Sequence, residues 1–266
     1  MKHQGHRARK RFGQNFLHDI GVIQRIIDSV NPKPGDNIVE IGPGLGALTE
    51  HLFEAAGSIH VVELDRDLVE RLQQRFKTKD NFHIHSSDAL KFNFGALIRN
   101  NKLRIVGNLP YNISTPLLFH LMEQVDSIQD IHCMLQKEVV DRICAGPGDN
   151  NYGRLSVMLQ YYCQAQHLFN VGADAFQPSP KVESAILRLT PHAEPPVLID
   201  DKKLFAQLVS QAFNQRRKTL RNSLKNYLSE DAIKSLDINP SARPETLNLI
   251  DFAKLSNHAK PNNEMA

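Results

Sequence analysis

The sequence predicts an α/β fold, in which a mostly parallel sheet carries helices on both faces and a small all-helical domain follows. Strand-like apolar segments alternate with amphipathic helical segments from residue 37 onward. A glycine turn at 42–46 follows the first strand, as in doubly wound sheets that bind ligands. The proline-dense segment 191–196 is typical of a linker, and only helical periodicity follows it. We therefore place the domains at 1–195 and 196–266.

The elements of the first domain follow from their periodicity, in chain order. Apolar residues at helical spacing predict a first helix at 20–30, which a proline turn ends. Further helices are expected at 47–56, at 67–76 and from Ser114, where Thr115 can cap the helix before Pro116. Short apolar runs predict strands at 37–41, 59–63, 82–86, 103–106, 131–135 and 185–189.

The second domain shows helical periodicity and a basic character. One predicted helical face consists of Phe205, Leu208, Val209, Ala212 and Phe213, and a second of Leu220, Leu224, Tyr227 and Leu228. Between residues 202 and 229 the chain carries seven basic residues and no acidic one. These features predict a small helical domain with a basic surface.

The composition of the 266-residue chain, 41% hydrophobic and 23% charged, excludes a disordered or collagen-like protein. Its three cysteines are too few and too widely spaced for a disulfide framework or a zinc cluster, and no metal site is expected. No apolar run approaches the length of a membrane span, and polar residues interrupt any secretion signal. We therefore expect a cytoplasmic protein that does not bind membranes.

The net charge of +3 is unevenly distributed along the chain. Residues 1–18 carry five basic and no acidic residues, residues 19–195 carry 16 basic and 21 acidic ones, and the remainder carries 11 basic and 8 acidic ones. Charged helix faces are often simply solvated, but clusters of one sign favour binding to nucleic-acid phosphates. The residues expected to contact such phosphates are Arg7, Arg9, Lys10, Arg11, Arg216, Arg217, Lys218, Arg221 and Lys225.

Three acidic residues, Glu40, Glu63 and Asp88, are expected at the carboxyl ends of neighbouring strands, where ligands bind in such sheets. With Gly42 and Gly44, the turn formally matches a dinucleotide fingerprint, so a nicotinamide oxidoreductase is one alternative. Glu40 argues against it, because a carboxylate beside the turn repels a pyrophosphate but suits a ligand with ammonium and sulfonium groups. S-adenosylmethionine is such a ligand, and these five residues are its expected contacts.

The segment Asn108-Leu109-Pro110-Tyr111 follows the fourth strand at the same edge of the sheet. An exocyclic adenine amine is a poor nucleophile, because its lone pair is delocalised into the ring. The side-chain carbonyl of Asn108 and the backbone carbonyl of Leu109 can accept its two protons, and Tyr111 can stack on the base. Such catalysis depends on positioning and electrostatics rather than on a covalent nucleophile. We interpret this segment as the catalytic element of an adenine methyltransferase.

At this point the chain resembles the ribosomal RNA adenine dimethyltransferases, and most closely their bacterial small-subunit branch. The resemblance covers nearly the whole chain and rests on a set of motifs. They are Gln14-Asn15-Phe16-Leu17, Glu40 to Thr49, Asn108 to Tyr111, Ala145 to Gly148, Tyr152 to Ser156, Phe176-x-Pro178-x-Pro180-Lys181-Val182 and Phe213-Asn214-Gln215-Arg216-Arg217-Lys218-Thr219.

The resemblance implies a class I, Rossmann-like methyltransferase fold with an antiparallel seventh strand. It also implies that Asn15, Leu17 and Asn108 join the contacts to S-adenosylmethionine, and that Phe176 joins Tyr111 around a flipped adenine. The implied reaction dimethylates two adjacent adenines in the last hairpin loop of 16S ribosomal RNA, on a small subunit or its precursor, and contributes to small-subunit biogenesis. A monomer is expected.

Two further alternatives concern the substrate and the activity. A related family methylates large-subunit RNA and gives macrolide resistance, and it shares the asparagine-proline-tyrosine element. The segments 45–49 and 215–219 look like the small-subunit enzyme rather than that relative. A ribosome assembly factor that acts by binding alone is the other alternative, although the intact segment 108–111 favours catalysis.

Overall fold

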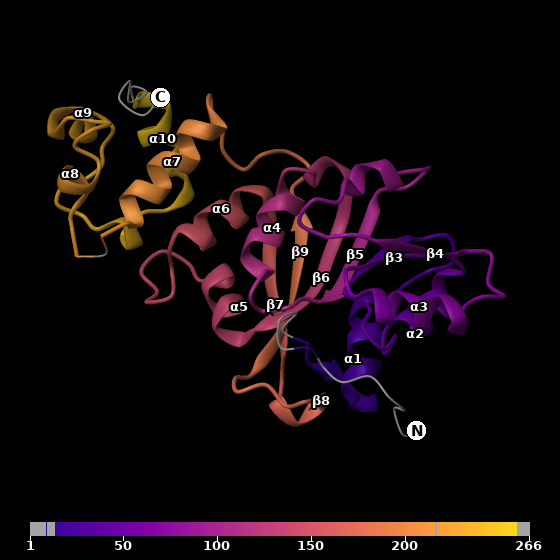
Figure 1. Ribbon diagram of the computed structural model, residues 1–266. Coiled ribbons are helices and arrows are strands. Elements are labelled where there is room, and N and C mark those ends of the chain that lie inside the picture. The colour runs from indigo at the N-terminus through magenta and orange to yellow at the C-terminus, as the bar shows by residue number, and fades with distance from the viewer. Residues whose placement is uncertain (1–8, 10–13, 216, 260–266) are drawn as a thin grey trace. The chain divides into compact units, whose positions relative to one another are not determined.

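The computed structural model describes residue 9, residues 14–215 and residues 217–259. Its main sheet has seven strands in the order β4-β3-β2-β5-β6-β9-β7 (Figure 1). They are β2 (Asn37–Ile41), β3 (Ile59–Glu63), β4 (Phe82–Ser86), β5 (Leu103–Asn108), β6 (Ile128–Gln136), β7 (Cys163–Val171) and β9 (Ser184–Pro191). Neighbouring strands from β4 to β6 pair in parallel, whereas β9 runs antiparallel to β6. The predicted α/β fold with one antiparallel strand is confirmed.

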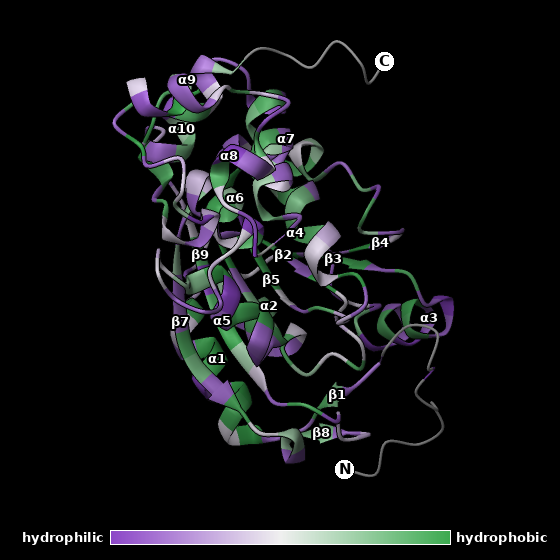
Figure 2. Ribbon diagram, turned by 90° about the vertical axis from the view of Figure 1, so that its left-hand side faces the viewer, coloured by the Kyte–Doolittle hydropathy of each residue, from purple (hydrophilic) through white to green (hydrophobic). Residues whose placement is uncertain are grey.

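Helices connect these strands and cover both faces of the sheet. They are α1 (Ile20–Val30), α2 (Thr49–Ala56), α3 (Arg66–Arg75) and α4 (Ser114–Met122). Two further helices, α5 (Lys137–Cys144) and α6 (Arg154–Tyr162), follow β6 in the chain. Successive strand residues point to opposite faces, and Ile38 and Val39 are both fully buried. Strands buried on both faces carry largely apolar runs, and Figure 2 shows green, hydrophobic stretches along the strands of the sheet.

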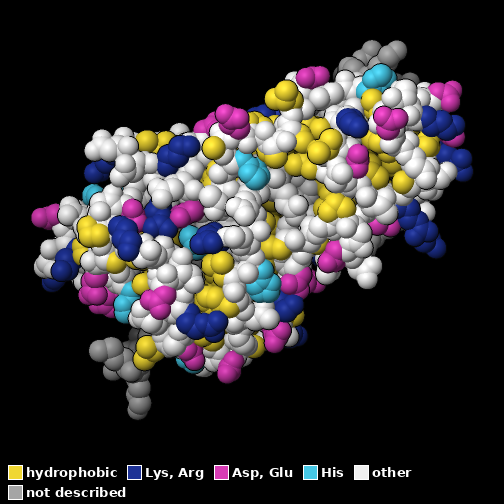
Figure 3. Space-filling model, turned by 180° about the vertical axis from the view of Figure 1, so that it is seen from behind, with side chains coloured by type: hydrophobic (Ala, Val, Ile, Leu, Met, Phe, Trp, Pro, Cys, Tyr) yellow, Lys and Arg dark blue, Asp and Glu magenta, His cyan; other side chains and the backbone are white. Residues whose placement is uncertain are grey.

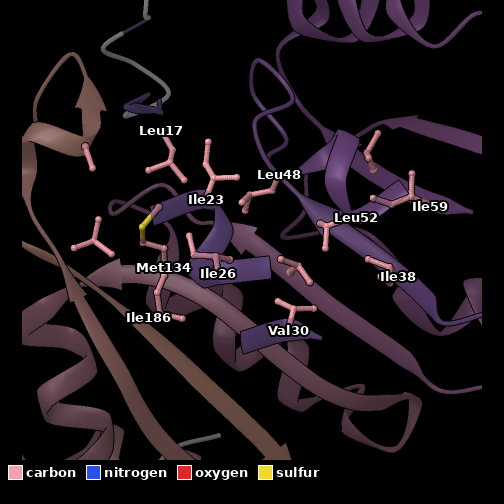
Figure 4. Close-up of a cluster of buried hydrophobic side chains, with 14 of the residues drawn as sticks. Leu17, Ile23, Ile26, Val30, Ile38, Leu48, Leu52, Ile59, Met134 and Ile186 are labelled. Atoms are coloured by element: carbon pink, nitrogen blue, oxygen red, sulfur yellow. The ribbon is translucent and has the colours of Figure 1, made fainter. Parts of the chain in front are cut away.

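Helix α1 supplies much of the core on one face of the sheet (Figure 4). Its carboxylate cap is Asp19, which accepts a hydrogen bond of 2.8 Å from the Val22 amide. The buried residues Ile23, Ile26 and Val30 recur at helical spacing, so one stripe of the helix faces the sheet. This stripe packs in a cluster with residues of β2, β3, β6 and β9, of which Ile38, Ile59, Met134 and Ile186 are examples.

One predicted helix start and one predicted helix cap differ from the structure. α2 begins at Thr49 rather than at residue 47, because the glycine turn continues up to the helix. α4 begins at Ser114, but its N-cap position is held by Ile113. The expected capping role of Thr115 is therefore wrong, since this residue lies inside the first turn.

Two short strands, β1 (Phe16–Leu17) and β8 (Phe176–Gln177), were not predicted from the sequence. They pair antiparallel with each other, with Leu17 opposite Phe176. The His18 amide also donates a hydrogen bond of 3.0 Å to the Ala175 carbonyl. This pairing holds the end of the N-terminal arm on the segment that follows β7.

The chain divides into two compact units, Met1–Val140 with Gln166–Pro191, and Asp141–Ala165 with His192–Ala266. The predicted division into 1–195 and 196–266 differs from these units because residues 141–165 group with the C-terminal part. Aromatic contacts within the second unit show why. Tyr161 packs on Phe205 and Tyr152 on Phe213, at 5.4 and 6.1 Å between ring centroids.

The second unit is built on α6 together with α7 (Lys202–Phe213), α8 (Leu220–Ser223), α9 (Glu230–Ser235) and α10 (Leu249–His258). The predicted apolar face of α7 is buried except at Phe213, which is half-buried, and α7 contacts α6, α8 and α10. Within the described residues, no helix has the length and apolar character required to cross a membrane.

Candidate active site

A cavity of about 330 Å³ opens at the carboxyl ends of β2, β3 and β5, within the first unit. All the residues predicted to contact the cofactor line it, namely Asn15, Leu17, Glu40, Gly42, Gly44, Glu63, Asp88 and Asn108. Leu109, Pro110 and Tyr111 line it as well. Parallel strands end at the same edge of the sheet, so Glu40 and Tyr111, 71 positions apart in the sequence, share one site. Their roles in binding remain predictions.

The glycine turn gives the cavity a wall of bare backbone. Gly42 and Gly44 have positive φ angles of 67° and 58°, a conformation that side chains disfavour. A Cβ atom on Gly44 would lie 3.2 Å from the ring of Phe16. Glycine at this position therefore lets the turn approach the N-terminal arm and leaves its backbone accessible to a ligand.

Glu40 is a buried acid at the wall of this cavity, and one of its oxygens has no partner. It is 2% exposed, and within the described chain its Oε2 atom has no hydrogen-bond partner. Burial raises the pKa of Glu40 from 4.5 to about 8, and the nearby Glu63 carboxyl adds to the effect. A positively charged ligand group would supply the missing partner.

Glu63, at the end of β3, is held by backbone amides. Its Oε1 atom accepts hydrogen bonds of 2.9 and 2.8 Å from the amides of Leu64 and Asp65, and Oε2 lies 3.4 Å from the Gly44 amide. Burial nevertheless raises the pKa of the Glu63 carboxyl. Because Oε2 has only this one long contact, it retains capacity to accept a hydrogen bond from a ligand.

Asn108 ends β5, and its side chain is oriented by the N-terminal arm. Its Nδ2 atom donates a hydrogen bond of 3.0 Å to the backbone carbonyl of Asn15. This contact fixes which end of the amide is occupied. In the described part of the chain the Oδ1 atom of Asn108 has no hydrogen-bond partner, so an acceptor oxygen is left at the wall of the cavity.

Tyr111 is anchored at both ends. Its backbone carbonyl accepts a hydrogen bond of 3.1 Å from the hydroxyl of Ser114, at the start of α4. Its phenol oxygen lies 2.6 Å from the hydroxyl of Ser184. Burial raises the pKa of Tyr111, so the phenol stays protonated at neutral pH. The ring is therefore a fixed aromatic surface at the cavity.

Comparison with known proteins identifies the family. The family model described as ribosomal RNA adenine dimethylase matches residues 5–260, nearly the whole chain. The chain belongs to the ribosomal RNA adenine dimethylase family. The prediction of a methyltransferase is confirmed, and the nicotinamide oxidoreductase alternative is excluded.

Relatives with known names agree with this membership. Ribosomal RNA small subunit methyltransferase A of Pseudomonas aeruginosa is 56% identical over 253 residues, which cover 95% of this chain and 94% of the relative. The protein of the same name from Acinetobacter baylyi is 57% identical over 261 residues, with coverages of 98% and 95%.

Solved structures confirm the class I methyltransferase fold. A dimethyladenosine transferase from Plasmodium falciparum has a TM-score of 0.79 at 27% identity and covers 90% of this chain and 95% of its own. A 23S rRNA methyltransferase has a TM-score of 0.72 at 24% identity, with coverages of 92% and 99%, and shows the shared fold alone.

The N-terminal arm of this dimethylase is attached beside the cavity. Arg9 forms ion pairs with Asp65, at 2.8 Å, and with Asp67. The side chain of Gln14 donates to Asp65 at 3.0 Å. Arg9 was predicted to contact RNA phosphate, but the structure pairs it with two acids of its own chain. The other predicted residues of this cluster, Arg7, Lys10 and Arg11, lie outside the described residues.

Phe176 occupies a different environment from the one its predicted role requires. It is 1% exposed and belongs to the hydrophobic cluster that also contains Leu17, its partner in the β1–β8 pair. It does not line the cavity. Stacking of this ring on a substrate base remains a prediction.

Sequence reasoning missed two residues that support the site, Ser184 and Asp65. Ser184 contacts Tyr111 across 73 positions of the sequence, and Asp65 receives the N-terminal arm. No local pattern marks a contact between distant segments. Asp65 does carry the signal of a helix cap, since its side chain caps α3, but this signal says nothing about the arm.

The basic residues of the second unit fall into two groups. Lys218 and Lys225 line a small polar hollow, together with Gln211, Gln215, Asn222, Ser223 and Asn226. Arg221 is instead 3.7 Å from the carboxylate of Glu230. Arg217 is exposed, and Arg216 lies outside the described residues. The two lysines form no ion pair with a described residue and share a hollow, so they are stronger candidates for binding phosphate than Arg221.

Proposed function

We propose that this protein uses S-adenosylmethionine to dimethylate the exocyclic amines of two adjacent adenines in the 3′-terminal hairpin loop of 16S ribosomal RNA. Its substrate is the small ribosomal subunit or a precursor of it, so the enzyme takes part in small-subunit biogenesis. It acts in the cytoplasm as a monomer. The relatives with 56 to 57% identity carry the name small subunit methyltransferase, which supports this choice of substrate.

The observation that carries the proposal is the orientation of Asn108. Its amide nitrogen is occupied by the Asn15 carbonyl, so its oxygen is the end available to a substrate at the cavity. An acceptor oxygen at this place can take a hydrogen bond from an adenine amine. This hydrogen bond draws the lone pair of the amine out of conjugation with the ring. The backbone carbonyl of Leu109 is the proposed acceptor for the second amine proton.

The residues around the cavity fit S-adenosylmethionine. When bound, this cofactor would supply a methyl group activated by a sulfonium. The unpartnered oxygen of Glu40 suits its positive charge, and Glu63 has acceptor capacity for ribose hydroxyls. Asp88, whose Oδ1 atom accepts a hydrogen bond from the Leu90 amide at 3.0 Å, is the proposed acceptor for the adenine amine of the cofactor.

The proposal is tested with small subunits that lack the modification. Incubation with the protein and S-adenosylmethionine, followed by mass spectrometry of the nucleosides, should detect dimethyladenosine. Large subunits and free adenosine serve as competing substrates. Methylation of large subunits alone would support the macrolide-resistance alternative, and absence of product from competent small subunits would overturn the proposal.

Replacement of Asn108 separates catalysis from binding. We expect Asn108→Ala to slow methyl transfer by roughly 10²- to 10³-fold, the usual effect of removing one preorganised polar group at a reacting centre. Binding to small subunits should persist. Asn100→Ala is the matched control, because Asn100 is exposed and does not line the cavity. An unchanged rate in Asn108→Ala would show that Asn108 takes no part in catalysis, whereas binding without methyl transfer by the unmodified protein would favour a role in binding alone.

A further inference from the structure

Ser184 is an unusual residue for its position in β9. It is fully buried and is followed along the strand by the buried apolar residues Ala185, Ile186 and Leu187. A buried hydroxyl without a hydrogen bond is costly. The hydroxyl of Ser184 finds its partner in the phenol of Tyr111, at 2.6 Å. A serine at this position is therefore explained by its contact with the site.

The backbone of Ser184 is held firmly by the sheet. Ser184 pairs with Gln136 at the end of the antiparallel register between β9 and β6. One residue earlier, the Glu183 carbonyl accepts a hydrogen bond of 2.9 Å from the Lys137 amide. The hydroxyl of Ser184 is thus presented from a rigid strand end, at the edge of the sheet where the cavity opens.

Tyr111, in contrast, lies in the loop between β5 and α4. Ser114 holds its backbone at the start of α4, but a tyrosine ring can still rotate about two side-chain bonds. The hydrogen bond from the ring tip to Ser184 removes this freedom, because it ties the far end of the ring to the sheet. The direction of the aromatic face then follows from two anchors on separate elements.

We propose that Ser184 is a positioning residue of this methyltransferase, which holds the ring of Tyr111 in the orientation that stacks on the target adenine. The inference rests on the proposed function, since it assigns a substrate contact to Tyr111. Ser184 itself touches neither the adenine nor the cofactor. It acts through Tyr111, so its loss should slow methyl transfer without weakening the binding of S-adenosylmethionine.

The hydrogen bond can be removed from either end. Ser184→Ala removes the serine hydroxyl, and Tyr111→Phe removes the phenol while keeping the aromatic ring. We expect each variant to lower the single-turnover rate on unmethylated small subunits by about threefold to tenfold, as for loss of one hydrogen bond. The double variant should be no slower than either single variant, because both remove the same contact. The dissociation constant for S-adenosylmethionine should not change.

Ser256→Ala is the matched control, because Ser256 is also buried but its hydroxyl has no partner among the described residues. Its rate should equal that of the unmodified protein. A wild-type rate in Ser184→Ala would overturn the inference, and so would rates that multiply in the double variant. If Ser184→Ala does not fold, the rate of Tyr111→Phe decides the question, because a wild-type rate there would show that the contact has no role.

A second measurement does not depend on methyl transfer. The Ser184 hydrogen bond lowers the pKa of the Tyr111 phenol against the effect of burial. Ser184→Ala should therefore shift the ultraviolet titration of Tyr111 to higher pH. The part of the signal that belongs to Tyr111 is identified by its absence in Tyr111→Phe. If the unmodified protein methylated no small subunits, the proposed function would fail while this titration still tested the contact. An unshifted titration would count against the contact itself.

Discussion

At the scale of single residues, Glu40 links cofactor binding to pH. Its carboxyl is protonated in the free protein up to about pH 8, because burial raises its pKa to that value. A cationic ligand favours the ionised form, so binding below pH 8 must release a proton. We expect the affinity for S-adenosylmethionine to rise between pH 6 and 7.5. Calorimetry at each pH, in buffers of different ionisation enthalpy, measures both the affinity and the released proton.

Glu40→Gln provides the control for this pH effect. The variant keeps the shape of the side chain but cannot ionise, so it should bind the cofactor more weakly and release no proton at this position. The amino group of the cofactor titrates in both proteins, so the difference between them reports on Glu40 alone. Equal pH dependence in the two proteins would show that Glu40 does not face the positive charge.

The sequence predicts individual site residues where a local rule applies. Glu40, Glu63 and Asn108 could be placed because the carboxyl ends of parallel strands meet at one edge of a sheet. The partner of Asn108 could not, because its contact with the Asn15 carbonyl joins residues 93 positions apart. Burial likewise decides the protonation of Glu40, and no residue next to it in the sequence reveals how deeply it lies.

At the scale of elements, the attachment of the N-terminal arm should strengthen cofactor binding. The arm carries Asn15 and Leu17 to the cavity, and Arg9 ties it to Asp65, which is almost fully buried. Charge-assisted hydrogen bonds to a buried carboxylate are stronger than exposed ion pairs. We expect Arg9→Ala to weaken the binding of S-adenosylmethionine by roughly threefold to tenfold, an effect typical of removing one such hydrogen bond. Titration calorimetry measures it.

The neighbouring Arg66 provides a matched control for the arm. Arg66 is an exposed arginine beside Asp65 with no ion pair in the described chain. Arg66→Ala should leave the cofactor affinity unchanged. A general loss of positive charge would not weaken the binding of a cationic cofactor, so equal weakening in both variants would show that a local disturbance near Asp65, and not the attachment of the arm, is the cause.

The strand pair β3–β4 carries a group of stacked histidines that should lower stability in acid. His60 stacks on His83 and His85, with ring centroids 4.6 and 5.3 Å away. Burial lowers the pKa of His60 from 6.5 to about 4. Between these two pH values the unfolded chain therefore binds a proton that the folded protein does not. The free energy of unfolding is highest above pH 6.5 and falls as the pH decreases toward 4.

Thermal unfolding between pH 7 and 5 tests this expectation. His60→Phe keeps an aromatic ring but cannot take up a proton, so its melting temperature should fall less steeply than that of the unmodified protein. His51→Gln, at an exposed position, should follow the unmodified protein. Parallel slopes for His60→Phe and the unmodified protein would contradict the role of His60. His132, whose pKa burial also lowers to about 4, accounts for part of the slope that remains.

The strands and helices with a clear apolar periodicity could be predicted, but the helices α5, α6, α9 and α10 and the shortest strands could not. β1 and β8 have two residues each, too few for any periodicity to show, and their pairing joins segments that are far apart. Strand β7 was missed because its outer position leaves several side chains partly exposed, which breaks up the apolar pattern. These elements gain their stability from tertiary contacts rather than from local propensity.

At the scale of the whole molecule, the total net charge is small, but the charge differs in sign between regions of the chain. Figure 3 shows acidic and basic side chains intermixed over the visible face. The basic character of the second unit was predicted from composition, but ion pairing decides which charges remain available. Glu230 partners Arg221, whereas Lys218 and Lys225 share a polar hollow without an acidic residue in its lining.

These differences predict how binding to small subunits depends on salt. Replacing Lys218 and Lys225 together by glutamine should weaken binding and reduce the slope of log K against log salt by about 1 for each phosphate that the variant no longer neutralises. Arg221→Gln should have a smaller effect, because Glu230, which it shares with Lys234, offsets part of the charge of Arg221. Filter binding at several salt concentrations gives the slopes.

The matched control for the double variant replaces Lys202 and Lys254, two exposed lysines of the same unit that lie outside the hollow. This variant loses the same net charge, so a long-range electrostatic effect would weaken both proteins alike. If the lysines of the hollow contact RNA phosphate, only the variant at Lys218 and Lys225 binds small subunits more weakly. Its affinity for S-adenosylmethionine stays unchanged, because the cavity is lined entirely by residues of the first unit. Equal salt slopes in the two double variants would therefore show that the hollow does not bind RNA phosphate.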